Sequence, residues 1–148
     1  QISDASNRAG VLTKLETGQL GLLERTEKAA RGKKDVGAFT EEQQSLALEV
    51  ADFHKELSGG QSGPAKELLP LLGRIAAAEK GMKLAADALR AKQTKDAIAH
   101  QEMASDAIGE ARQMAAGQLE QFNQQQQLIG FEQSVGRAAA GMADIASS

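Results

Sequence analysis

Histidines and their acidic neighbours are the side chains of this sequence best suited to chemistry near neutral pH. Asp96 and His100 are four residues apart, so a helix would place both on one face. Such a pair binds a divalent cation only when further ligands converge on it, and Glu102 and Asp106 fall on other faces of the helix. We therefore interpret Asp96 and His100 as a solvated ion pair. His54 is interpreted as a residue at the edge of an apolar stripe.

The other candidates for chemistry have simpler structural explanations. Glu41 and Glu42 suit the first turn of a helix, where acidic side chains complement the helix dipole. Glu79 interrupts an apolar stripe, so it either lies at the edge of a helix–helix seam or is buried opposite a basic residue. The segment 32–34 (Gly-Lys-Lys) lacks the further glycines and the hydroxyl residue of a phosphate-binding loop. Four methionines are expected to fill the core: Met82, Met103, Met114 and Met142.

These observations predict a protein that is not an enzyme, with no catalytic residue, no metal site and no cofactor. The sequence contains no cysteine, which excludes disulfides and thiolate chemistry. A net charge of −3 and an aromatic content of 3% argue against nucleic-acid binding, which needs a basic stripe and usually aromatic stacking. No apolar run approaches the roughly 20 residues that span a bilayer, so we predict no transmembrane segment.

Composition favours an all-α fold. The core residues are mainly Ala and Leu, and no stretch strings together the β-branched residues that a strand prefers. We predict one domain, 1–148, built as an elongated antiparallel bundle of four to five helices with coiled-coil-like seams. The expected helices are about 3–31, 40–58, 64–91, 94–129 and 131–146, with a flexible loop at 58–63.

Local signals define several helix ends. Thr40 and Gln43 have the spacing of a capping box, with Phe39 in the place of a hydrophobic staple residue. Pro70 lies early in the third helix and predicts a kink or a late start. Residues 31–34 supply a basic end and a glycine stop for the first helix. Gly130 leaves two possibilities open, because the last segment is either a fifth helix or a continuation of the fourth.

Apolar residues recur at steps of three and four along each predicted helix, which is the spacing of a packed face. Gln101 and Gln118 fall on the stripe of the fourth helix, where buried glutamines can fix register. The predicted helix–helix interface consists of Leu46, Val50, Phe53, Leu57, Leu68, Leu72, Ile75, Met82, Leu89, Ala104, Ile108, Ala111, Ala115, Phe122, Phe131, Val135 and Met142.

The third and fourth helices carry opposite charge. Residues 61–95 hold seven Lys or Arg and three Asp or Glu, whereas residues 96–148 hold two and seven. A short link joins these helices, so they should pair as an antiparallel hairpin, within one chain or between subunits. Each exposed ion pair contributes under about 1 kcal/mol, so the charges select partners more than they stabilise.

The hairpin segments also carry a family resemblance. Residues 79–89 (Glu-Lys-Gly-Met-Lys-Leu-Ala-Ala-Asp-Ala-Leu) are followed by 95–104 (Lys-Asp-Ala-Ile-Ala-His-Gln-Glu-Met-Ala), and 22–27 and 42–47 echo the same pattern. The pattern resembles the helical C-terminal regions of large bacterial membrane-anchored proteins of unknown function. This resemblance spans roughly residues 19–119 and implies a location in the cell envelope and a scaffolding role.

Two functions are consistent with this sequence. The first is a structural subunit that pairs with copies of itself in a homo-oligomer or filament of the bacterial cell envelope or exterior. The alternative is a periplasmic helical-bundle sensor or adaptor that binds a ligand or a partner helix. The chain begins at Gln1 rather than Met, so we expect either a removed leader or a boundary within a longer protein. A removed leader would place the protein in the periplasm, on the cell surface or outside the cell.

Overall fold

The computed structural model describes residues 2–59 and 66–147. It is 92% helical, and the described residues contain no strand. The elements in chain order are α1 (Ile2–Arg31), the 3-10 helix η1 (Val36–Phe39), α2 (Thr40–Leu57), the 3-10 helix η3 (Lys66–Leu68), α3 (Leu69–Arg90) and α4 (Thr94–Ser147). The predicted all-α bundle is confirmed.

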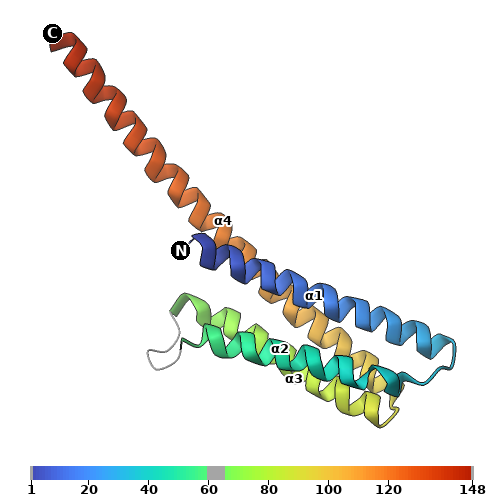
Figure 1. Cartoon of the computed structure of the whole chain (residues 1–148). Coiled ribbons are helices and arrows are strands. Elements are labelled where there is room, and N and C mark those ends of the chain that lie inside the picture. The colour runs from blue at the N-terminus through green and yellow to red at the C-terminus, as the bar shows by residue number, and fades with distance from the viewer. Residues whose placement is uncertain (1, 60–65, 148) are drawn as a thin grey trace.

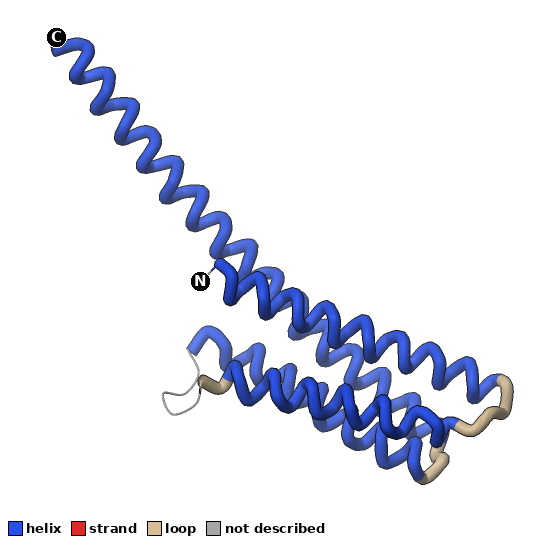
Figure 2. The backbone as a smooth tube through the Cα atoms, in the orientation of Figure 1, coloured by secondary structure: helices blue, strands red, loops and turns tan. Residues whose placement is uncertain are grey.

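The four α-helices pack as an up-down-up-down bundle, in which each helix runs antiparallel to the one before it (Figure 1). The most extensive contacts join α3 to α4, α1 to α4 and α2 to α3, and the contacts between α1 and α2 are far fewer. The α1–η1 and α3–α4 turns lie at one end of the bundle, and α4 continues beyond the other end (Figure 2). Residues 60–65, which include most of the predicted loop and the predicted start of the third helix, lie outside the described residues.

The core is built where the heptad spacing places apolar side chains on the inner faces. It forms two clusters. The larger one, which we call the large core, contains Leu12, Leu15, Ala47, Val50, Phe53, Leu71, Ile75, Ala78, Met82, Ala104, Ala107, Ile108, Ala111 and Ala115. The smaller one, the small core, lies at the end with the two turns and contains Ala29, Val36, Ala88, Leu89 and Ala97.

Small residues set the spacing between α3 and α4. A Cβ atom added at Gly81 would lie 3.2 Å from the Cβ and the backbone N of Ala104, and 3.2 Å from the carbonyl oxygen of His100. Two of these three neighbours are backbone atoms, which cannot rotate away. Ala104, which was predicted to lie in the helix–helix interface, therefore marks a close approach of two helix backbones.

The capping box predicted at Thr40 and Gln43 is wrong. Thr40 Oγ1 donates a hydrogen bond to the carbonyl of Gly37 at 2.8 Å, and Phe39, without a side-chain cap, precedes the helix. The side-chain cap lies earlier, where Asp35 Oδ1 accepts a hydrogen bond from the Gly37 amide at 2.9 Å. A 3-10 turn between Asp35 and α2 shifts the cap upstream, because it already satisfies the first amides of the helix.

Lysines occupy the left-handed positions at the ends of α1 and α3. The φ angles of Lys33 and Lys92 are 56° and 59°. In both turns, this residue and the next one donate their amides back into the last turn of the helix, as in a Schellman motif. The predicted glycine stop is therefore only partly right. The helix does end at Arg31, but the residue in the left-handed conformation is Lys33 and not Gly32.

Two further helix ends resolve alternatives left by the sequence. Pro70 lies in the first turn of α3, so it marks a late start and no kink is needed. α4 is one continuous helix of 54 residues, so the boundary expected between residues 129 and 131 is absent. A single glycine weakens a helix by about 1 kcal/mol but removes no backbone hydrogen bond, which explains why Gly130 does not end α4.

Candidate functional site

Four polar side chains lie fully buried in the middle of the bundle, between the large core and the small core. They are Gln19 and Thr26 from α1, Gln43 from α2 and Gln101 from α4, and we call them the polar layer. Buried amides are tolerated only when they are hydrogen-bonded, since an unpaired one costs about 1–3 kcal/mol. The polar layer is therefore the part of the core in which geometry is most constrained.

The hydrogen bonds of the polar layer connect three helices. Gln19 and Gln43 pair reciprocally, with Nε2–Oε1 distances of 3.2 and 2.7 Å. Gln101 Nε2 donates to Gln43 Oε1 and to Thr26 Oγ1, both at 3.1 Å. Thr26 in turn donates to the Leu22 carbonyl of its own helix at 2.8 Å. A shift of α1, α2 or α4 by one residue would break several of these bonds at once, so the layer favours the observed register of the three helices.

The polar layer is not fully satisfied. Gln101 Oε1 and Ser105 Oγ, one helical turn apart on α4, are buried without a hydrogen-bond partner. The sequence stripe correctly placed Gln101 in the core but did not identify its partners. The sequence does contain a pattern that places two of these polar side chains in the core. One stripe of α1 has steps of three and four throughout: Leu12, Leu15, Gln19, Leu22, Thr26 and Ala29. Gln19 and Thr26 interrupt the apolar character of this stripe without interrupting its spacing.

Most residues of the predicted helix–helix interface lie inside the bundle. The buried ones are Val50, Phe53, Leu72, Ile75, Met82, Leu89, Ala104, Ile108, Ala111 and Ala115. Leu46, Leu57 and Leu68 are half-buried and pack against the large core. The side chains of Phe122, Phe131, Val135 and Met142 lie outside the described residues. The bundle thus places the first thirteen of these residues in contacts within one chain.

Ion pairs join the helices near the bundle surface. Arg25 on α1 pairs with Glu42 on α2 and lies 5.8 Å from the ring centroid of Phe39. The hydrogen bond to Glu42 raises the pKa of the Arg25 guanidinium above its ordinary value, and slight burial acts in the opposite direction. Glu16 on α1 pairs with Arg112 on α4. Polar contacts therefore supply much of the link between α1 and α2, whose contacts are far fewer than those of α1 with α4 or of α2 with α3.

The titratable residues that suggested chemistry lie apart from one another. Asp96 is exposed and His100 half-buried, and no ion pair joins them in the part of the chain that the structure describes, so that predicted pair is wrong. Glu79 is half-buried and pairs at 2.9 Å with Lys83 one turn later, which places it at the edge of the α3 seam. Among the described residues, no three His, Cys, Asp or Glu side chains converge as a metal site would require.

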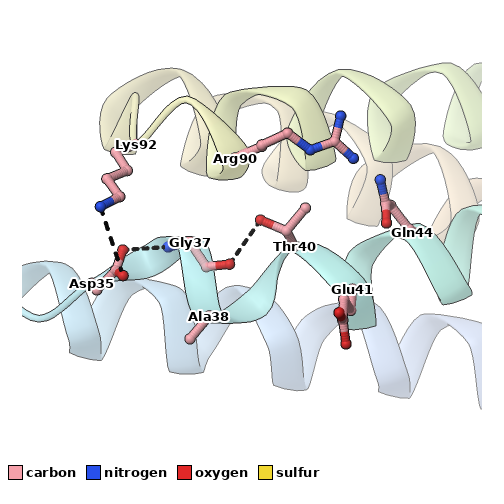
Figure 3. Close-up of a pocket in the computed structure, with 8 residues that line it drawn as sticks. All are labelled: Asp35, Gly37, Ala38, Thr40, Glu41, Gln44, Arg90 and Lys92. Carbon is pink, nitrogen blue, oxygen red and sulfur yellow. Dashed lines mark hydrogen bonds and ion pairs between the residues drawn. The ribbon is translucent and has the colours of Figure 1, made fainter.

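An open cleft of about 570 Å³ lies at the end of the bundle that carries the two turns. Figure 3 shows Arg90 and Lys92, from the end of α3 and its turn, facing Asp35, Thr40 and Gln44 across the cleft. Lys92 Nζ lies 3.9 Å from Asp35 Oδ2, and both side chains are largely exposed. The cleft can accept a small polar group, but it brings together no nucleophile and base at hydrogen-bonding distance.

Comparison with known protein families, characterised proteins and solved structures finds no match to this chain. What the chain itself defines is therefore a four-helix bundle with a hydrogen-bonded polar layer and one helix that is much longer than the others. None of the helices in the described residues is both long enough and apolar enough to cross a membrane.

Proposed function

We propose that this protein is a non-enzymatic structural protein that assembles with copies of itself through the end of α4. The observation that carries this proposal is the length of that helix. α4 has 54 residues, whereas α1, α2 and α3 have 30, 18 and 22. At about 1.5 Å per residue, α4 is about 81 Å long and α1 about 45 Å. Figure 1 shows the end of α4 extending away from the other helices.

The last contacts with the bundle that described side chains of α4 make lie near residue 118. Ala115 is its last buried residue among the described side chains, and Gln118 Nε2 donates to the Glu67 carbonyl at 3.1 Å. We call residues 120–147 the overhang. Its described side chains are all exposed: Glu120, Gln121, Asn123, Gln124, Gln125 and Gln127. At about 1.5 Å per residue α4 is about 36 Å longer than α1, and its end extends beyond the other helices (Figure 1).

A helix of this length needs a partner. Isolated helices are marginal in water, and most helical stability in proteins comes from packing of an apolar face. The sequence of the overhang has apolar residues at 131, 135, 138, 142 and 145, at steps of four and three. A second copy offers the same stripe, and two antiparallel copies related by a two-fold axis would each cover the other. By the resemblance noted above, the bacterial cell envelope or exterior is the location that we propose.

Light scattering measures the mass of the particle in solution and so tests the assembly. The concentration is measured by refractive index, because a chain without Trp or Tyr barely absorbs at 280 nm. We expect a mass above that of one chain, and a return to one chain in the double variant Val135→Glu/Met142→Glu. The control is Leu48→Glu/Met103→Glu, which adds the same charge at side chains that are 65% and 44% exposed on the bundle. It should leave the mass unchanged. A wild-type protein that stays monomeric at high concentration would refute self-assembly.

One observation favours a second candidate function, a sensor or adaptor that binds a ligand. The cleft beside Arg90 and Lys92 is open and large enough for a small polar molecule. A thermal-shift screen of small carboxylates and phosphates would test it, with Arg90→Ala compared against Lys80→Ala, which removes an exposed charge elsewhere on α3. Stabilisation that Arg90→Ala abolishes and Lys80→Ala retains, in a protein that does not assemble, would favour this candidate.

A further inference from the structure

Positive charge gathers at the end of the bundle where the two turns meet. Residues 28–35 and 87–96, which we call the basic cap, contain seven Lys or Arg and three Asp, although the whole chain has a net charge of −3. The contact between Lys92 and Asp35 shows that the two turns lie side by side. The exposed cations in the turns themselves are Arg31, Lys33, Lys34, Arg90, Lys92 and Lys95.

The cations of the basic cap are not used to hold the fold together. In the described residues, the only ion pair that involves one of them is Lys92–Asp35, at 3.9 Å between two largely exposed groups. Elsewhere on the bundle, Arg25, Arg74 and Arg112 each pair with a glutamate on a neighbouring helix. Three arginines on the sides of the bundle thus link neighbouring helices, whereas no cation of the basic cap forms an ion pair with a glutamate in the part of the chain that the structure describes.

The backbone conformation of the two turns also indicates that the charge of the basic cap has a use. Lys33 and Lys92 both hold left-handed φ angles, of 56° and 59°. Glycine is the residue that adopts this conformation without steric cost, and it is the usual residue at this position of a helix end. Lysine at both equivalent positions places a long cationic side chain at the tip of each turn, against the local preference of the backbone. A residue type that is unfavourable for the backbone occurs at both turns of the same bundle end, which indicates that the lysine charge has a use.

We propose that the basic cap docks this protein, end-on, on an anionic phospholipid surface. Charge alone suffices for such docking. A protein partner would require an apolar or aromatic centre in the interface, and none of the large exposed apolar residues of the described chain lies in the cap. Recognition of single-stranded nucleic acid would require aromatic stacking platforms, and the cap has no aromatic residue. The proposal goes beyond self-assembly and does not depend on it.

Vesicle co-sedimentation of the whole chain tests this proposal. We expect binding to vesicles of phosphatidylcholine mixed with phosphatidylglycerol, no binding to phosphatidylcholine alone, and loss of binding at high salt. Each Lys near an anionic surface contributes about five-fold to partitioning, so Lys33→Gly/Lys92→Gly should weaken binding by about 25-fold. Glycine is the favoured residue at both positions, so this variant should fold at least as well as the wild type, which circular dichroism checks.

A matched control carries the same change of charge away from the cap. Lys14→Gln/Lys80→Gln removes two exposed lysines from the sides of α1 and α3 and should bind within about two-fold of the wild type. Free glycerol phosphate, added at constant ionic strength, should not compete; full competition would reassign the cap to a soluble phosphate ligand and overturn membrane docking. Equal binding to both kinds of vesicle, no binding to either, or equal losses in the two variants would also overturn it. None of these readouts depends on whether the overhang assembles, provided that binding is compared per chain.

Discussion

The large core and the small core lie on opposite sides of the polar layer, and they differ in the size of their side chains. The large core is filled by residues such as Leu12, Ile75, Met82 and Ile108, all fully buried. The small core contains one leucine and one valine among three alanines. Apolar burial stabilises in proportion to area, at about 25 cal/mol per Å². We therefore expect the large core, toward the overhang, to stabilise the bundle more than the small core beside the basic cap.

The largest expected effect comes from truncating the large core. Ile75→Ala should lower the free energy of unfolding by about 4 kcal/mol, because neighbouring side chains surround the cavity on all sides. Leu89→Ala should lower it by only about 2 kcal/mol, because the small core lies beside two turns that can close around the missing atoms. Urea denaturation followed by far-ultraviolet circular dichroism measures both. Equal losses would show that the two clusters are packed equally well.

Breaking the polar layer should have the next largest effect. Gln43→Leu removes both hydrogen bonds of the buried Gln19 amide and leaves Gln101 with only its bond to Thr26, so it should destabilise the bundle by about 2–3 kcal/mol. The triple change of Gln19, Gln43 and Gln101 to Leu should instead be neutral or stabilising by up to about 3 kcal/mol, because no amide is left unpaired.

The triple variant also tests what the polar layer is for. If it fixes register, an all-leucine layer should permit alternative alignments of the helices, visible as broadened amide resonances or as mixed masses in light scattering. Sharp resonances and a single mass in a more stable triple variant would mean that register is set elsewhere, for example by the turns. Gln101→Leu alone is a useful intermediate, since Gln19 and Gln43 keep their reciprocal bonds.

The bundle could be predicted from the sequence because its signal is repeated many times. Stripes such as Ile75, Met82 and Leu89 keep one phase over several turns, and the structure buries all three. Individual helix ends were harder. A capping box at Thr40 and the cap found at Asp35 use the same kinds of side chain a few residues apart. A cap at either residue would be worth about 1 kcal/mol, so the sequence pattern alone does not choose between them.

The polar layer was only partly predictable for a different reason. The spacing identified Gln101 as a core position, but pairing it with Gln19 and Gln43 requires the relative register of three helices. Register is a property of the assembled bundle and is not encoded in any single helix. The basic cap was missed for the same reason, since its two halves are about 60 residues apart in the sequence and meet only in the fold.

The seam between α3 and α4 offers a test of intermediate size. Gly81→Ala would place a methyl group 3.2 Å from the Ala104 backbone nitrogen and the His100 carbonyl oxygen, so the two helices must move apart. We expect a loss of about 1–2 kcal/mol, although alanine favours a helix by about 1 kcal/mol over glycine. Gly73→Ala is the control, because nothing lies within 4 Å of the added Cβ on the same helix. That variant should gain stability, and a gain in both would mean that α3 and α4 can move apart at Gly81 at little cost.

The smallest expected effect tests whether Lys33 in the basic cap lowers the free energy of unfolding. Lys33→Gly should raise the free energy of unfolding by about 0.5–1 kcal/mol, because glycine relieves the left-handed strain at φ 56°. Gly32→Ala is the complementary change, since Gly32 has no positive φ and its added Cβ would make only ordinary contacts, the nearest at 3.6 Å. It should also stabilise, by about 0.5 kcal/mol, through a less flexible unfolded chain. If both gains are measured by urea denaturation, then moving glycine by one residue would improve the fold, and lysine at position 33 must be explained by the charge that it presents. If Lys33→Gly destabilises the bundle instead, the lysine side chain stabilises the turn itself, and its presence at position 33 needs no anionic partner.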